Sequence, residues 1–361
     1  MDMNGKSMYG IHCGATENAP RCDAHRTTLR RLSHHIAFLT FLLSMLCSPW
    51  QSVAAQESTS VFNFLNLPLS ARSTALGGKN ISTIEDDISL IDQNPALLSG
   101  VNDRTMGLNF MTYMRGSKTG SASYAQIAGE RGTWGATAQF VSYGSMKETL
   151  PSGEIIGDMN ALDLCLSGMY SYELGERWVG GATGKFIYSH YGEFTSCALA
   201  VDLGLSYFLE ESDFSLSGVA RNVGGQVKAF GDHHERLPFD LEVGFTKGLA
   251  HAPVYVSLTM VDLTRWSKDY FYNNGKKVSN GRVLMNHFNL GVDLRPTRII
   301  YIAAGYNFRR ASEMKAAGSS HAAGLSFGAG LQMNRIKFGV AYAKYHVDAP
   351  TLSFSLAYNI K

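Results

Sequence analysis

The chain has 361 residues, of which 17% are charged and 45% hydrophobic, and its formal net charge is +2. So small a net charge gives no reason to expect a nucleic-acid partner. No stretch after residue 60 approaches the roughly 20 continuous apolar residues that a transmembrane helix needs. The apolar residues are instead spread along the chain, as in a β protein with one apolar face.

The N-terminal region contains an apolar run over residues 36–47, preceded by Arg30 and Arg31. A run of this length with a positive flank and a small residue, Ala55, further on is typical of a secretory signal peptide. We therefore expect residues 1–55 to be a cleaved signal peptide. The long flank before the apolar run leaves the true start codon open.

The next segment, residues 56–103, shows no strand alternation. Asp86 and Asp87 are placed to cap a short helix, and Asn94-Pro95 would end it. We expect this segment to form a plug, or hatch, inside a barrel built by the strands that follow. A periplasmic extension is the alternative.

From residue 104 onward, apolar and polar residues alternate with period two. In the last segment Leu352, Phe354 and Leu356 alternate with Ser353 and Ser355, which places them on opposite faces of a strand. We count fourteen such segments. They centre near residues 109, 124, 138, 167, 184, 202, 218, 242, 258, 290, 303, 328, 340 and 355.

The connections between these segments alternate between short and long. The short ones are Gly129–Gly132, Leu174–Arg177, Glu210–Asp213, Arg295–Arg298 and Met333–Arg335. The long ones include Ser145–Asn160, Gly224–Leu237, Thr264–Met285 and Arg309–His321. Short periplasmic turns and longer outer loops are typical of outer-membrane barrels. The sequence therefore predicts an all-β fold, in which residues 104–361 form a closed antiparallel transmembrane barrel of about 14 strands behind a hatch with a small helix.

No catalytic, cofactor-binding or metal site is expected, because the chain has none of the motifs that carry such chemistry. Eight charged residues are predicted to face the lumen. They are Asp163, Lys185, Asp202, Arg221, Asp240, Glu242, Asp293 and Lys337. They could line a pore or pair with each other across a plugged lumen, and the presence of both signs favours pairing.

The longest predicted loop, Thr264–Met285, is rich in aromatic residues: Trp266, Tyr270, Phe271 and Tyr272. Exposed aromatic side chains dominate the cores of protein interfaces. We expect a docking site for a surface partner or for lipopolysaccharide. The alternative is a loop that folds back over the barrel mouth.

The hatch region also carries a family resemblance. The stretch Phe62–Pro68, then Arg72 with Gly77-Gly78, then Asn94-Pro95, resembles the N-terminal region of the PorV/PorQ family of the Bacteroidetes type IX secretion system. The Phe-x-Phe-Leu-x-Leu-Pro opening is more similar to the PorQ branch of that family. The Asn-Pro-Ala element is similar to the hatch of FadL-type fatty-acid transporters, whose fold the family shares.

That resemblance implies a fourteen-stranded barrel in the outer membrane of a Gram-negative bacterium, of the Bacteroidetes. It implies an anchoring role, in which the barrel holds a PorZ-like surface protein and works with PorV and the sortase PorU. Enzymatic activity is not expected, because the chain shows no catalytic constellation. The alternative, from a different class, is a FadL-like channel for a hydrophobic small molecule. The lumen should discriminate between them, because transport needs a path whereas anchoring needs a sealed barrel and adhesive outer loops.

Overall fold

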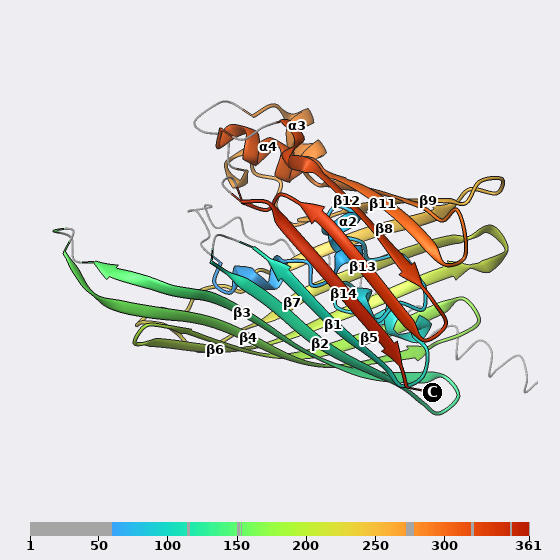
Figure 1. Cartoon of the computed structure of the whole chain (residues 1–361), viewed down its shortest axis with the longest axis horizontal. Helices are drawn as coiled ribbons and strands as arrows, with labels where there is room; N and C mark the ends of the chain where they lie inside the picture. The colour runs from blue at the N-terminus through green and yellow to red at the C-terminus, as the bar shows by residue number, and fades with distance from the viewer. Residues whose placement is uncertain are drawn as a thin grey trace, which may run out of the picture. The chain divides into compact units, whose positions relative to one another are not determined.

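The computed structural model describes residues 60–113, 116–149, 152, 154–271, 278–318, 321–346 and 349–360. The expected signal peptide and Tyr272 lie outside these residues. The fold is a closed antiparallel barrel of 14 strands (Figure 1), which confirms the predicted class and strand number. Among the described residues, no helix has the length and apolar character to cross a bilayer.

Each strand pairs with its neighbours along the chain, and the first strand closes the barrel against the last, from Thr105↔Asn359 to Met111↔Ser353. The predicted centres lie within three residues of the observed strand midpoints. The strands are β1 (Thr105–Thr112), β2 (Lys118–Ala128), β3 (Gly132–Thr149), β4 (Ile155–Glu173), β5 (Trp178–Tyr191), β6 (Phe194–Leu209), β7 (Phe214–Lys228), β8 (Asp240–Gly248), β9 (Val254–Met260), β10 (Phe288–Leu294), β11 (Ile300–Asn307), β12 (Leu325–Gln332), β13 (Ile336–Ala343) and β14 (Thr351–Asn359).

Apolar and polar residues alternate because successive side chains lie on opposite faces of the barrel wall. In β14, Leu352, Phe354 and Leu356 are 38–44% exposed on the outside, whereas Thr351 and Ser353 are buried on the inside. An apolar outer face and a polar inner face invert the arrangement of a water-soluble barrel and suit insertion into lipid. The wall is also uneven, because β3 to β7 contain 14 to 19 residues and β8 to β14 only 7 to 9.

The prediction of a long loop over Ser145–Asn160 is wrong. There β3 and β4 continue as a hairpin, with Ser145 opposite Asn160 and Met146 opposite Met159. The projecting hairpin exposes both charged and apolar residues, such as Lys147 and Ile155. A hairpin that rises beyond the bilayer is wetted on both faces, so it does not need the alternation by which the other strands were recognised.

The loop predicted over Gly224–Leu237 is shorter than expected, because β7 continues to Lys228. The other two long connections contain helices. The β9–β10 connection holds η5 (Lys268–Tyr270) and α3 (Asn280–Asn286), and the β11–β12 connection holds α4 (Phe308–Ala316) and η6 (His321–Gly324).

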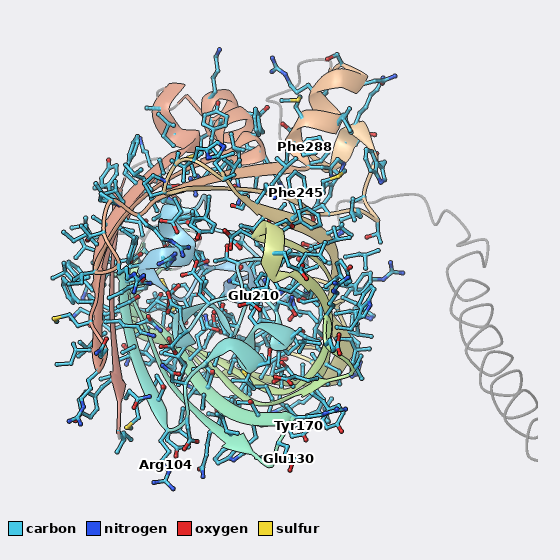
Figure 2. The ribbon with its side chains drawn as sticks, turned by 90° about the vertical axis from the view of Figure 1, so that its right-hand side faces the viewer. Arg104, Glu130, Tyr170, Glu210, Phe245 and Phe288 are labelled. Atoms are coloured by element: carbon cyan, nitrogen blue, oxygen red, sulfur yellow. The ribbon has the colours of Figure 1, made fainter. Side chains whose placement is uncertain are left out.

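Residues 60–103 lie inside the ring of strands, where they appear in blue to teal in Figure 2. Their short helices are η1 (Asn63–Asn66), α2 (Ala71–Ala75), η2 (Ile88–Leu90) and η3 (Pro95–Gly100). Asp87 caps η2 by accepting a hydrogen bond from the Ser89 N–H, and Asn94 caps η3 by accepting one from Ala96. We refer to residues 60–103 as the hatch.

Candidate functional site

The hatch is hydrogen-bonded to the barrel wall through α2. The Ala71 N–H donates to Ser355 Oγ at 2.8 Å, and the hydroxyls of Thr74 and Ser353 lie 3.2 Å apart. All four residues are buried or partly buried. Because buried polar groups need partners, these bonds favour the docked position of α2 against β14.

Wall glycines leave room for the hatch. A Cβ atom at Gly328 in β12 would stand 2.6 Å from the Cβ of Ala75, and one at Gly181 in β5 would stand 2.5 Å from the Ala96 nitrogen. Real Cβ atoms do not approach this closely, so any side chain at either position would displace the hatch. The wall is therefore shaped around the hatch on opposite sides of the lumen.

Arg72 links the hatch to the wall by charge. Its side chain is 1% exposed, and its Nη2 lies 2.9 Å from Glu85 Oε2 and 2.5 Å from Asp293 Oδ2 in β10. Its guanidinium also stacks over the Tyr301 ring, 4.3 Å from the centroid. Arg295 pairs with the same Asp293 carboxylate at 2.8 Å. Breaking a buried pair of this kind is costly, since it leaves a charge without a partner.

The predicted lumen charges are inside the barrel, and all but Lys337, which is partly exposed, are buried. Lys185 pairs with Asp202 at 2.6 Å. Glu242 pairs with Arg221 at 3.6 Å and with Lys79 of the hatch at 2.6 Å. The wall thus balances part of its charge internally and part of it with the hatch.

Two of the wall carboxylates accept hydrogen bonds from neighbouring groups. Asp163 accepts from the hydroxyls of Tyr143 and Tyr191 at 2.7 and 2.9 Å. Asp240 accepts from the backbone N–H of Asp262 at 2.7 Å. These bonds give both buried carboxylates polar partners inside the barrel.

The sequence prediction missed the hatch side of this network. Lys79, Glu85 and Asp86 are functional partners of wall charges, and Asp86 pairs with Lys337. All three lie in the stretch without alternation, where no periodic pattern marks a lumen-facing position. The one available signal was charge itself, in a segment otherwise rich in small and apolar residues.

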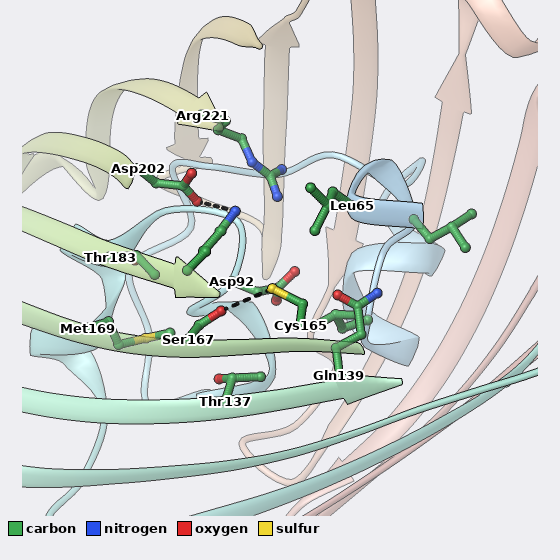
Figure 3. A pocket seen from close by; sticks show the side chains of 13 residues that line it. Leu65, Asp92, Thr137, Gln139, Cys165, Ser167, Met169, Thr183, Asp202 and Arg221 are labelled. Carbon is green, nitrogen blue, oxygen red and sulfur yellow. Dashed lines mark hydrogen bonds and ion pairs between the residues drawn. The ribbon is translucent and has the colours of Figure 1, made fainter. Parts of the chain in front are cut away.

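A small cavity lies between the hatch and the tall wall of β3 to β7 (Figure 3). Its free space is about 30 Å³, room for about two water molecules. The hatch contributes Leu65 and Leu67 to the lining, and the wall contributes Met169, Lys185 and Arg221. The cavity is therefore amphipathic, with leucine side chains and Asp92 from the hatch and both apolar and charged side chains from the wall.

The wall is irregular beside this cavity. The register of β6 and β7 shifts between Val201 and Leu203, and Asn222 adopts a left-handed conformation with φ of 54°. Asp202, which lines the cavity, accepts a hydrogen bond from the Asn222 N–H at 2.7 Å. Bulges of this kind bend a strand and occur preferentially near functional sites and barrel rims.

The two ends of the hatch are held differently. Residues 61–69 make few polar contacts with the wall, chiefly Val61 N–H to Arg236 O at 3.2 Å and Gln139 Nε2 to Phe64 O at 3.4 Å. Otherwise this stretch packs in an apolar cluster with the wall through Phe62, Phe64 and Leu65. The segment beside the cavity is thus held by apolar packing, whereas α2 is held by ion pairs and hydrogen bonds.

The aromatic residues of the predicted docking loop are in different environments. Trp266 is 48% exposed, whereas Phe271 is 2% exposed and belongs to the apolar core of the outer loops. The Tyr270 hydroxyl donates to Asp262 at 2.8 Å. Trp266 is therefore the aromatic side chain of this set, among the described residues, that is free to contact another molecule.

No protein-family model and no curated protein sequence matches the chain. Its architecture, however, is similar to three solved barrels. The Pseudomonas putida toluene transporter TodX is 13% identical over 81% of this chain and 96% of its own, with a TM-score of 0.51. This chain has the fold of the FadL-type outer-membrane channels.

The other two solved barrels are similar to this chain in fold to the same degree. The CymD monoaromatic hydrocarbon channel is 14% identical over 81% of this chain and 97% of its own, with a TM-score of 0.51. A Pseudomonas aeruginosa FadL homologue is 10% identical over 81% and 98%, with a TM-score of 0.50. Identities this low establish a shared fold alone. Together with the apolar outer face, that FadL-type fold indicates an outer-membrane protein of a Gram-negative bacterium.

Proposed function

We propose that this chain is an outer-membrane channel for small, largely apolar molecules, closed by its own hatch. The observation that carries the proposal is the amphipathic cavity between residues 61–69 and the tall wall. Toluene and monoaromatic hydrocarbons, named for two barrels of the same fold, set the expected size class.

The gate is the stretch of residues 61–69. An apolar molecule that enters the cavity competes for the surface that Leu65 and Leu67 cover. When this stretch moves away, Lys185 and Asp202 keep each other as partners, so no buried charge is orphaned. Displacing α2 instead would break the ion pairs of Arg72, which is far more costly.

The test fixes the gate, residues 61–69, to the wall by a covalent cross-link. In a Cys197→Ser chain, Leu65→Cys is bridged to the native Cys165 with a short bifunctional thiol reagent, since both positions line the cavity. Uptake of radiolabelled toluene by cells without another channel of this fold should fall to background. A matched lock between Thr74→Cys and Ser353→Cys, which fixes α2, should leave uptake unchanged. Normal uptake through the Leu65 lock would overturn the proposal.

A second candidate function is the anchoring role in the type IX secretion system of Bacteroidetes. It is supported by the PorV/PorQ-like motif, in which Arg72 and Asn94 hold the hatch in place, and by the exposed Trp266 on an outer loop. Its partners would be a PorZ-like surface protein with PorU and PorV. Purification in mild detergent followed by mass spectrometry tests it, and absence of such proteins in the native host would exclude it.

A further inference from the structure

On the short side of the barrel, the strands alone are not long enough to span the apolar layer of the bilayer. Both β9 and β10 contain 7 residues, so they are about 24 Å long and, at a tilt of about 40°, rise about 18 Å. The apolar band of an outer-membrane barrel is about 25 Å tall. About 7 Å of lipid-facing height is missing on this side, whereas β3 and β4, with 18 and 19 residues, extend well beyond it.

The two helical loops lie where this height is missing. In Figures 1 and 2, α3 and α4 stand on the outward side of the short wall and not across the barrel mouth. Asp262 of one loop pairs with Arg309 of the other at 2.6 Å, and α3 packs against α4. We call residues 261–271, 278–287, 308–318 and 321–324 the outer loop unit.

The Asp262–Arg309 contact is electrostatically strong. Burial alone would raise the pKa of Asp262, but Arg309 and Tyr270 beside it outweigh burial and hold that pKa below its usual range. Tyr270 and Phe271 both lie against the Arg309 guanidinium, at 4.5 and 5.4 Å from their ring centroids. The two loops are therefore joined to each other by an ion pair and by ring contacts.

The unit exposes apolar side chains around the C-terminal turn of α3. Trp266, Leu284 and Met285 are 48, 45 and 43% exposed, as much as the lipid-facing residues of β14. The Trp266 ring lies 4.1 Å from the ring of His287, the residue that follows α3, so the indole is fixed beside this turn. The next lipid-facing strand, β10, begins at Phe288. The apolar outer face of the wall thus continues into the loop unit.

The unit is also positively charged. Its residues include six Lys and Arg against three Asp and Glu, an excess of three positive charges in a chain whose total is +2. Lys268, Arg282 and Lys315 are exposed. Apolar and aromatic residues with cations beside them are typical of segments that lie in the membrane interface.

We propose that the outer loop unit is an interfacial anchor that binds phosphate-bearing lipid of the outer leaflet. Trp266, Leu284 and Met285 enter the acyl region above the short strands and complete the apolar band there. The exposed cations of the unit, Arg282 and Lys268 first among them, bind the lipid phosphate groups. This site is separate from the lumen and does not depend on what passes through it.

The apolar part of the proposal is tested by fluorescence. In a Trp134→Phe, Trp178→Phe chain from which the leader has been removed, Trp266 is the remaining tryptophan. Lipids brominated in the upper acyl chain should quench it at least about twofold, as expected for an interfacial indole, and aqueous iodide should not. A chain that keeps Trp134 instead serves as the positive control. Quenching of Trp266 by iodide alone would overturn the proposal.

The charged part is tested by lipid retention. Nanodiscs containing lipopolysaccharide are compared with nanodiscs of phosphatidylcholine, and the phosphorylated lipid retained after extraction is measured by mass spectrometry. Arg282→Gln with Lys268→Gln should weaken retention about thirtyfold, from about 1 kcal/mol per cation at an anionic lipid surface. Arg131→Gln with Arg335→Gln, exposed cations of the opposite turns, is the control. Equal retention by both double variants, with the barrel still heat-modifiable, would refute the phosphate site.

Discussion

Replacing Arg72 by Met should loosen the hatch without opening the wall. Arg72 is 1% exposed and pairs with Glu85 and Asp293, and breaking such a buried pair costs about 3–5 kcal/mol. Arg295 remains beside both carboxylates and neutralises part of their charge. Nε and Nη1 of Arg72 donate no hydrogen bond to the described residues. Removing them therefore breaks no hydrogen bond, which makes the loss of stabilising free energy smaller. We therefore expect about 2–3 kcal/mol, or roughly a 30- to 140-fold rise in the hatch-opening equilibrium.

The assay is the rate at which a buried thiol in the hatch reacts with a maleimide. Ser73 is fully buried in α2, so Ser73→Cys is introduced into a chain in which Cys165 and Cys197 are replaced by Ser. Labelling should accelerate by the stated factor in the Arg72→Met chain. Arg177→Met is the control, because Arg177 pairs with Glu211 on the exposed face of a turn. An unchanged labelling rate in an intact barrel would refute the role of Arg72 in holding the hatch.

Three further outcomes follow from the same geometry. Phe354→Arg puts a charge on the lipid face at a cost of about 2–4 kcal/mol near the midplane, so heat-modifiable barrel should be lost. Gly328→Val, whose Cβ would meet Ala75, should expose the hatch to protease, whereas Gly168→Ala, with open space around it, should not. Because the pKa of Asp262 is depressed by Arg309, its contribution to stability is complete above about pH 4 and is lost as the pH falls below that. The tryptophan fluorescence of the outer loop unit should therefore change only in strong acid.

The barrel wall was predictable because one physical cause marks most of its residues. Each strand separates lipid from a polar interior, so the alternation recurs from Thr105 to Asn359 and places all fourteen centres. The extent of the strands was not predictable where that cause ends. In the hairpin of β3 and β4, Ser145 pairs with Asn160 beyond the apolar band, and water on both faces removes the pattern.

The contacts of the hatch lay beyond sequence reasoning for a different reason. Arg72 meets Asp293 across 221 residues of chain, and no local period connects the two positions. The same holds for the outer loops. Which aromatic side chain is buried, Phe271, and which is exposed, Trp266, depends on how α3 packs against α4. Composition identified the loop as unusual but could not divide its aromatic residues between core and surface.

In the proposed channel, the two halves of the barrel have different roles, and their strands differ in length accordingly. The short half holds α2 through Ser353 and Ser355 and continues outward into the loop unit. The tall half carries the cavity, the apolar gate of residues 61–69 and the register shift near Asp202. A segment that moves must not leave charges unpaired, and residues 61–69 carry no charge, while Lys185 and Asp202 beside them pair with each other. In the proposed channel, the half that holds α2 by ion pairs and hydrogen bonds is thus the frame, and residues 61–69, which make few polar contacts beside the tall half, are where opening costs least.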